Sequence, residues 1–247
     1  MKLLIAALGV SLGMTVSSSF AEIRFASGPE RTSLLELFTS EGCSSCPPAE
    51  AQFSRLTNNP GLWKQFVPVA WHVDYWDRLG WRDPFASPAF TARQNRYAAL
   101  WHNDGVYTPA FVLDGKEMRN GLALGSDQQV TGVVSAASED GKSWSISFRP
   151  VAGEGGDWDA HLALLGTGIS SKIDAGENGG RNLRHDFVVL AQKDAPLQKE
   201  AGGLTASLTL PASAESVPRQ AVAFWVTRRG ELAAVQATGG WLGRSAP

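Results

Sequence analysis

The sequence predicts a mixed α/β domain followed by an all-β domain. Up to about Ser138, apolar runs of strand length alternate with segments of helical pattern, which is the order of elements in an α/β domain. From Lys142 onward the apolar runs are short and alternating, and clusters of Gly, Asp, Ser and Pro separate them, which is typical of an antiparallel sandwich or barrel. We therefore expect one domain over residues 22–138 and a β-sandwich-like domain over residues 139–247.

Turn and helix signals divide the first domain into elements. The apolar run Ser33–Phe38 is bounded by polar residues and is long enough for a buried strand. A helix is expected to begin at Pro47 and Pro48, because N–H groups in the first helical turn have no partner within the helix. The dipeptide Asp114-Gly115 predicts a tight hairpin turn. The expected strands are Ser33–Phe38, Phe66–Val73, Ala110–Leu113 and Lys116–Asn120, and the expected helices are Ala49–Leu56, Pro88–Leu100 and Ser126–Ser138.

The second domain is expected to consist of strands alone. Its apolar segments are too short for helices, and turn-forming residues lie between them. The expected strands cover Trp144–Val151, Ala160–Ile169, Asn182–Leu190, Leu204–Leu210, Ala221–Thr227 and Glu231–Ala237.

Composition excludes several classes of function. The chain has 247 residues, of which 43% are hydrophobic and 19% charged, enough to bury a sizeable core. The 22 Lys and Arg residues face 24 Asp and Glu residues, for a net charge of -2. That balance does not provide the basic surface that binds nucleic acid or anionic lipid. We therefore expect no nucleic-acid partner, and the sequence indicates no cofactor.

The N-terminus has the pattern of a secretory signal peptide. Lys2 precedes an apolar run from Leu3 to about Val16, and small residues stand at Ser19 and Ala21. The run is shorter than the roughly 20 residues that cross a membrane, and no later run approaches that length. We therefore expect cleavage after Ala21 and a secreted or periplasmic protein with no membrane span once residues 1–21 are removed.

The two cysteines of the chain form a CxxC motif, Cys43-Ser44-Ser45-Cys46, between an expected strand and an expected helix. In that context the motif indicates redox chemistry, because a thiol at a helix N-terminus has a lowered pKa and a higher thiolate fraction. We expect Cys43 to be a partly exposed nucleophile. Cys46, one turn inside, is expected to resolve the mixed disulfide.

Two other functions compete with redox chemistry. The pair can be an inert structural disulfide on a scaffold, although closing so short a ring stabilises by only about 2 kcal/mol. Alternatively, Cys43 and Cys46 can bind or deliver Cu(I) with His72 as a third ligand, because thiolate and imidazole suit that ion. Zinc would need two ligands beyond the cysteines, and the four histidines of the chain show no paired spacing.

Several motifs carry a resemblance to known proteins. The order of strand, CxxC, helix, strand and Thr108-Pro109 before a hairpin resembles the thioredoxin-like superfamily. More narrowly, the sequence resembles a family of secreted bacterial proteins classed as a domain of unknown function with a thioredoxin-like fold. The segments that carry the narrower resemblance are residues 36–49, 72–76, 105–109 and 176–181. The resemblance implies that the first domain is an α/β thioredoxin-like domain.

The resemblance also implies roles for two residues next to the hairpin. Pro109 is expected to be cis and to pack against the cysteine pair, and the backbone at Thr108 to pair with a substrate chain. His72 and Asp74 lie at the end of an expected strand, where ligands gather in open α/β sheets, so both are candidates for lining a substrate groove. The sequence therefore predicts an exported thiol–disulfide oxidoreductase acting on the thiols or disulfides of other exported proteins.

Overall fold

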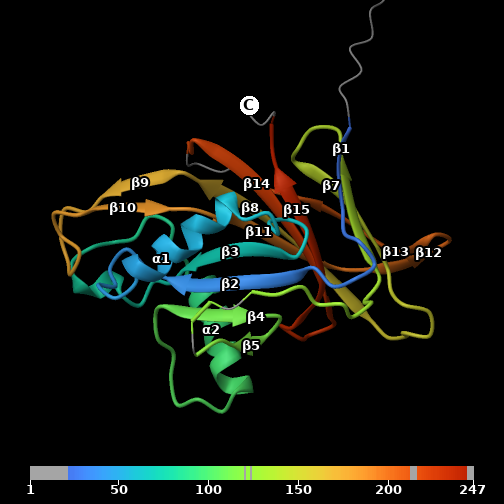
Figure 1. The fold of residues 1–247 in the computed structure, drawn as a ribbon, viewed down its shortest axis with the longest axis horizontal. Coiled ribbons are helices and arrows are strands. Elements are labelled where there is room, and N and C mark those ends of the chain that lie inside the picture. The colour runs from blue at the N-terminus through green and yellow to red at the C-terminus, as the bar shows by residue number, and fades with distance from the viewer. Residues whose placement is uncertain (1–21, 120, 123, 212–215, 244–247) are drawn as a thin grey trace, which may run out of the picture.

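The computed structural model describes residues 22–119, 121–122, 124–211 and 216–243 (Figure 1). The expected signal peptide therefore lies outside the described residues. The helices are α1 (Pro47–Ser54) and α2 (Pro88–Leu100), with short 3-10 turns at Arg55–Asn58 and Asp77–Leu79. The strands are β1 (Ile23–Ala26), β2 (Ser33–Thr39), β3 (Phe66–His72), β4 (Ala110–Leu113), β5 (Lys116–Glu117), β6 (Val133–Ser138), β7 (Ser143–Arg149), β8 (Trp158–Thr167), β9 (Ile169–Lys172), β10 (Asn182–His185), β11 (Val188–Pro196), β12 (Gln198–Glu200), β13 (Gly203–Thr209), β14 (Arg219–Arg228) and β15 (Ala234–Trp241).

The strands form two large sheets and one two-stranded ribbon. The larger sheet has eight strands in the order β15-β14-β8-β11-β3-β2-β4-β5, and the smaller has five in the order β1-β6-β7-β13-β12. The β9–β10 ribbon extends away from both sheets, on the side of the molecule where α1 lies (Figure 1). The β2–β3 and β3–β11 pairings are parallel, and the others in the eight-stranded sheet are antiparallel.

The expected fold class, an α/β thioredoxin-like domain followed by a separate β-sandwich-like domain, is wrong. The described chain is mostly β and sandwich-like, and strands from both halves of the sequence share the eight-stranded sheet. The junction is the parallel pairing of β3 with β11, where the Ala70 N–H donates to the Phe187 carbonyl at 2.8 Å. Every residue of β3 is buried, so this strand needs a neighbour on both edges to satisfy its backbone.

The expected helix over Ser126–Ser138 is also wrong, because its second half forms strand β6. Burial alternates residue by residue along β6, which places Val134 and Ala136 in the core and their neighbours nearer to solvent. That period of two, together with the β-branched pair Val133-Val134, favours a strand. β6 pairs with β1 on one side and β7 on the other, so strands from either side of residue 138 lie in one sheet.

Several other expected elements are confirmed. α2 spans Pro88–Leu100 as expected, and the Ser87 hydroxyl caps it by accepting from the Ala89 N–H at 3.3 Å. The hairpin between β4 and β5 turns at Asp114 and Gly115, both with positive φ, as a two-residue turn of the primed type requires. The expected strand Asn182–Leu190 is divided at Asp186-Phe187 into β10 and β11, which belong to different sheets.

Alternate side chains of the eight-stranded sheet enter cores on its two faces. In β2, Leu34 and Phe38 pack with α2, whereas Leu35 and Leu37 pack with α1. Side chains of β8 and β14 also alternate between the two faces. Those on the face opposite α2 pack against the five-stranded sheet. α1 and the five-stranded sheet therefore cover one face, and α2 covers the other. None of the helices in the described part of the chain is both long and apolar enough to cross a membrane.

Candidate functional site

The Cys43–Cys46 pair forms a disulfide between the end of β2 and the start of α1. Cys46 is the N-cap residue of α1, and its carbonyl accepts from the Ala49 and Glu50 N–H groups at 3.0 Å each. The Cys46 N–H donates to the Cys43 carbonyl at 3.2 Å, closing a tight turn. Gly42 permits this turn, because a Cβ there would lie 2.9 Å from the Cβ of Trp76. The disulfide therefore sits at the N-terminal end of the helix, as expected.

Both cysteines are buried, so the expectation of a partly exposed Cys43 sulfur is wrong. Each has an exposed fraction of 0%, although Ser44 and Ser45 between them are exposed. The turn between β9 and β10 holds the motif in place: the Asn178 amide donates to the Glu41 and Cys43 carbonyls at 2.8 and 2.9 Å. The sequence motif could not show this contact, because it joins segments about 135 residues apart.

A second segment approaches the disulfide from the loop before β4. The Thr108–Pro109 peptide bond is cis, as expected. The Thr108 carbonyl lies 3.8 Å from the Cys43 sulfur and accepts from the Ser45 hydroxyl at 3.4 Å. The Trp76 indole donates to the Thr108 hydroxyl at 2.8 Å, which fixes this side chain beside the motif. The structure thus brings together Thr108 and Cys43, two of the residues selected from the sequence.

The two other candidate residues occupy different surroundings. Asp74 is half-buried, and its carboxylate accepts from the Thr91 hydroxyl of α2 at 2.6 Å. His72 is buried at the end of β3, with Nδ1 2.7 Å from the Asp83 carboxylate and its ring 5.2 Å from that of His185. His72 therefore faces a buried polar cluster.

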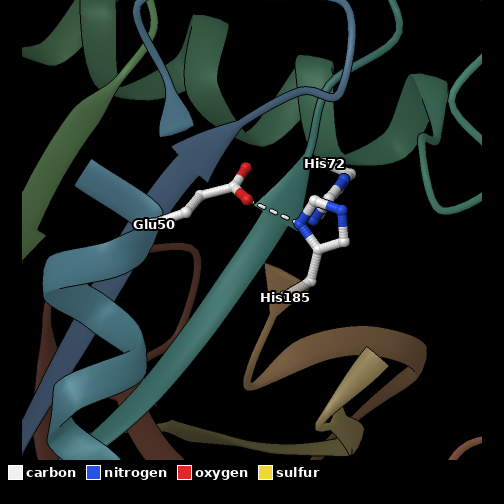
Figure 2. Close-up of side chains that lie close together, drawn as sticks. All are labelled: Glu50, His72 and His185. Carbon is white, nitrogen blue, oxygen red and sulfur yellow. Dashed lines mark hydrogen bonds and ion pairs between the residues drawn. The ribbon is translucent and has the colours of Figure 1, made fainter. Parts of the chain in front are cut away.

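That cluster contains five ionisable side chains, joined by ion-pair contacts: Glu41, Glu50, His72, Asp83 and His185. All five are buried. His185 Nδ1 lies 2.5 Å from a Glu50 carboxylate oxygen, and its Nε2 lies 3.1 Å from a Glu41 oxygen (Figure 2 draws Glu50, His72 and His185). The Thr39 hydroxyl donates to the other Glu50 oxygen, and the Trp81 indole donates to Glu41.

The charges in the cluster shift one another's titration. Burial by itself lowers the pKa of His185, but the Glu50 and Glu41 carboxylates outweigh it and raise that pKa to about 10. For Glu50, burial acts to raise the pKa, and the two imidazoles overcome this and lower it. The pKa of Asp83 is lowered in the same way, by His72 against the effect of burial.

Within the described part of the chain, His72 Nε2 has no hydrogen-bond partner, whereas His185 Nε2 and Glu41 Oε1 face each other at 3.1 Å as an ion pair. Among the described residues, Glu50, His72 and His185 form the group of three side chains whose donor atoms all lie within 4.8 Å of one another. From the sequence, His72 was a candidate for a substrate groove or a Cu(I) site, whereas Glu50 and His185 were not candidates for either. The positions that join it come from α1 and β10, and no spacing in the sequence links them.

Comparisons with known proteins identify the family. The family model described as "Protein of unknown function (DUF1223)" matches residues 34–227. The chain belongs to this family. No curated protein matches the chain.

Two solved structures resemble the protein. Protein AGR_C_4864 from Agrobacterium tumefaciens is 23% identical, with a TM-score of 0.59, over 89% of this chain and 98% of that one. HBP35 of Porphyromonas gingivalis is 15% identical, with a TM-score of 0.58, over 90% of this chain and 78% of that one. At these identities the likeness shows the fold of this member of the DUF1223 family and does not extend to activity.

Proposed function

We propose that this protein is an exported thiol–disulfide oxidoreductase whose redox pair is Cys43 and Cys46, acting on the thiols or disulfides of other exported proteins. The signal-peptide pattern of residues 1–21 supports export to a compartment where disulfides persist. The resemblance of the CxxC and Thr108-Pro109 motifs to those of thioredoxin-like proteins supports the chemistry.

One observation carries the proposal: a disulfide with only two residues between its cysteines lies at the N-terminal end of α1, next to the Thr108 carbonyl. A ring this small stabilises by only about 2 kcal/mol, so structural reinforcement is a weak reason for it. The helix end lowers the pKa of a thiol placed there, which favours its release as a thiolate when the disulfide is opened. Once local opening exposes it, the Thr108 backbone beside the sulfur also suits the docking of an extended substrate chain.

The exchange conserves atoms and electrons. A substrate thiolate attacks the Cys43 sulfur, forming a substrate–Cys43 disulfide and releasing Cys46 as a thiolate. A second thiolate of the substrate attacks the substrate sulfur of that bond, which forms the substrate disulfide and releases Cys43. The substrate loses two electrons and two protons, and the cysteine pair gains them. The reverse sequence reduces a substrate disulfide by the same steps.

Burial adds an opening step before exchange. Neither sulfur is accessible in the described conformation, so an attacking thiolate reaches Cys43 only after local displacement of its cover. The exposed Ser44 and Ser45 and the turn that carries Asn178 are the segments whose displacement uncovers the disulfide.

Substrate trapping tests the proposal. We expect a Cys46→Ser variant, expressed with its signal peptide, to accumulate mixed disulfides through Cys43, because the resolving thiol is absent. A Cys43→Ser variant serves as the matched control and is expected to trap far less. The measurement is non-reducing electrophoresis followed by mass spectrometry of the trapped partners. Absence of mixed disulfides from both variants, with both folded, would show that the disulfide is inert.

A further inference from the structure

We propose that Glu50, His72 and His185 bind a divalent transition-metal ion of the zinc class, in a buried site between α1 and the ends of β3 and β10. The proposal is independent of the proposed redox function, because neither cysteine is a ligand. Figure 2 shows the three side chains converging from α1, from the end of β3 and from the end of β10.

The spacing of the donor atoms fits a small ion after a minor adjustment. Zinc binds imidazole nitrogen and carboxylate oxygen at about 2.0–2.2 Å, so the ligand atoms of a tetrahedral site lie roughly 3.4 Å apart. The three side chains offer atoms within 4.8 Å of one another. On binding, the distant atoms move together, and the 2.5 Å contact between Glu50 and His185 widens as the ion enters between them. Rotation of side chains can supply movements of this size.

A carboxylate already orients His72 as a ligand. One Asp83 oxygen accepts from the Glu41 N–H at 2.8 Å and lies 2.7 Å from His72 Nδ1. Because this Asp83 oxygen already accepts from the Glu41 N–H, it acts as an acceptor, and Nδ1 carries the hydrogen in the contact with His72. A neutral His72 then has its lone pair on Nε2, the atom that lacks a partner. This carboxylate–imidazole arrangement is the usual support of a histidine that ligates a metal.

The unpartnered His72 Nε2 is not explained by hidden water. A small cavity lined by Glu50, His72 and His185 lies between α1 and β3, and it has no room for a water molecule. His72 and His185 have an exposed fraction of 1% each. A bare divalent cation is smaller than water and makes stronger bonds to a nitrogen lone pair. An ion therefore satisfies a nitrogen, His72 Nε2, that solvent cannot reach.

Charge balance favours a cation at the same place. The cluster holds three carboxylates, Glu41, Glu50 and Asp83, against two imidazoles. Even with both imidazoles protonated, three negative charges face two positive ones, and the group stays negative in the interior. Buried charge without compensation is costly. A divalent ion replaces the imidazolium protons with a stronger charge, and its nitrogen and oxygen donors suit zinc better than calcium or magnesium.

Zinc titration of the oxidised full-length mature protein tests the site. After treatment with a chelator, we expect calorimetry to show one Zn²⁺ per chain and Zn²⁺ to raise the melting temperature. Co²⁺ in place of Zn²⁺ is expected to give stronger visible absorption than hydrated Co²⁺, because the site supplies few ligands and excludes water. In the disulfide form the cysteines cannot act as ligands. A negative result in the zinc titration therefore does not bear on the proposed redox function, and a negative result in the trapping experiment does not bear on the zinc site.

Variants locate the site. Asp83→Asn removes a residue that supports a ligand without binding the ion, and it is expected to weaken Zn²⁺ binding by about 10- to 100-fold. His185→Ala and Glu50→Gln each remove a ligand and are expected to weaken Zn²⁺ binding by more than that. His161→Gln is the matched control, because His161 is also buried against a carboxylate, Asp194 at 2.7 Å, but its other nitrogen has a partner in Thr227. Circular dichroism checks that each variant folds.

Two results would overturn the proposal. The first is a wild-type protein, shown to be folded, that binds no Zn²⁺ or Co²⁺ at equimolar concentration. The second is binding of unchanged affinity in folded His185→Ala and Glu50→Gln variants. In either case the cluster is an ion-pair network in which His185 bridges Glu50 and Glu41.

Discussion

At the scale of single residues, Asp114 illustrates how a turn residue acquires an unusual charge state. It occupies the first position of the β4–β5 turn with φ of 47°, and its carboxylate accepts from the Leu34 N–H at 2.7 Å. Burial raises the pKa of Asp114 from its ordinary 3.8 to about 6, although Arg31 lies 3.9 Å away. The same aspartate therefore favours the hairpin by its conformation and opposes folding by its charge.

Replacing Asp114 with asparagine is expected to stabilise the protein near neutral pH. A carboxyl whose pKa is raised on folding stabilises the folded state fully only at pH values below its unfolded pKa of 3.8. This stabilisation is lost as the pH rises through its folded pKa of about 6. Asparagine retains the acceptor for Leu34 and tolerates positive φ. We expect Asp114→Asn to raise the free energy of unfolding at pH 7.5 by roughly 1–2 kcal/mol, after allowance for the lost attraction to Arg31.

Urea denaturation at several pH values measures this effect. The gain should shrink between pH 6 and pH 4, where the wild-type carboxyl becomes protonated in the folded state. Asp127→Asn is a suitable control, because Asp127 is a half-buried partner of the same Arg31. A stabilisation that stays constant from pH 4 to pH 7.5 would contradict the assigned cause.

At the scale of elements, the β9–β10 turn contacts the CxxC motif from a distant part of the sequence. Asn178 donates to the Glu41 and Cys43 carbonyls and accepts from Arg181 at 2.8 Å, and the Glu177 carboxylate accepts from the Ser44 N–H at 3.1 Å. These contacts join the ribbon to the loop that precedes α1. We expect these contacts to limit how often the disulfide becomes accessible.

Removing this contact is expected to speed reduction of the disulfide. Asn178→Ala deletes two hydrogen bonds to the motif, each with a net contribution of about 1 kcal/mol, so the open conformation should become about thirtyfold more populated. The rate of Cys43–Cys46 reduction by a small dithiol, followed by thiol labelling under native conditions, should rise by a similar factor. Asn182→Ala in the same ribbon is the control, since Asn182 is exposed and pairs with Ser170. Equal rates in the two variants would contradict this role for Asn178.

The sequence predicted individual helices and strands better than it predicted the contacts between them. Local signals predicted α2, the β4–β5 hairpin and β2, because Pro, Gly and apolar runs act over a few residues. The helix expected over Ser126–Ser138 was wrong because Val133–Ser138 finds partners in β1 and β7, which the segment alone does not reveal. Cys43 and Thr108 were selected from the sequence, whereas Glu50 and His185 meet only through the fold.

At the scale of the whole molecule, the two halves of the sequence depend on each other. The buried Gln236 side chain of β15 accepts from the Thr32 N–H at 2.8 Å and donates to the Glu30 and Gly132 carbonyls. The Tyr97 hydroxyl of α2 donates to the Leu232 carbonyl at 3.2 Å, near the C-terminal end of the described chain. Buried polar groups of the first half therefore find their partners in the second half.

This dependence predicts that residues 22–138 do not fold alone. Without the second half, β3 loses β11, β6 loses β7, and the carbonyls of Glu30 and Gly132 lose Gln236. Unpaired backbone and exposed apolar faces of this extent exceed the stability of an ordinary domain, about 5–15 kcal/mol. We expect the fragment to show no cooperative thermal transition by circular dichroism. The mature chain, prepared in parallel, should unfold in one transition, since the eight-stranded sheet spans both halves. A fragment with a sharp transition and native-like near-ultraviolet signal would instead establish an independent first domain.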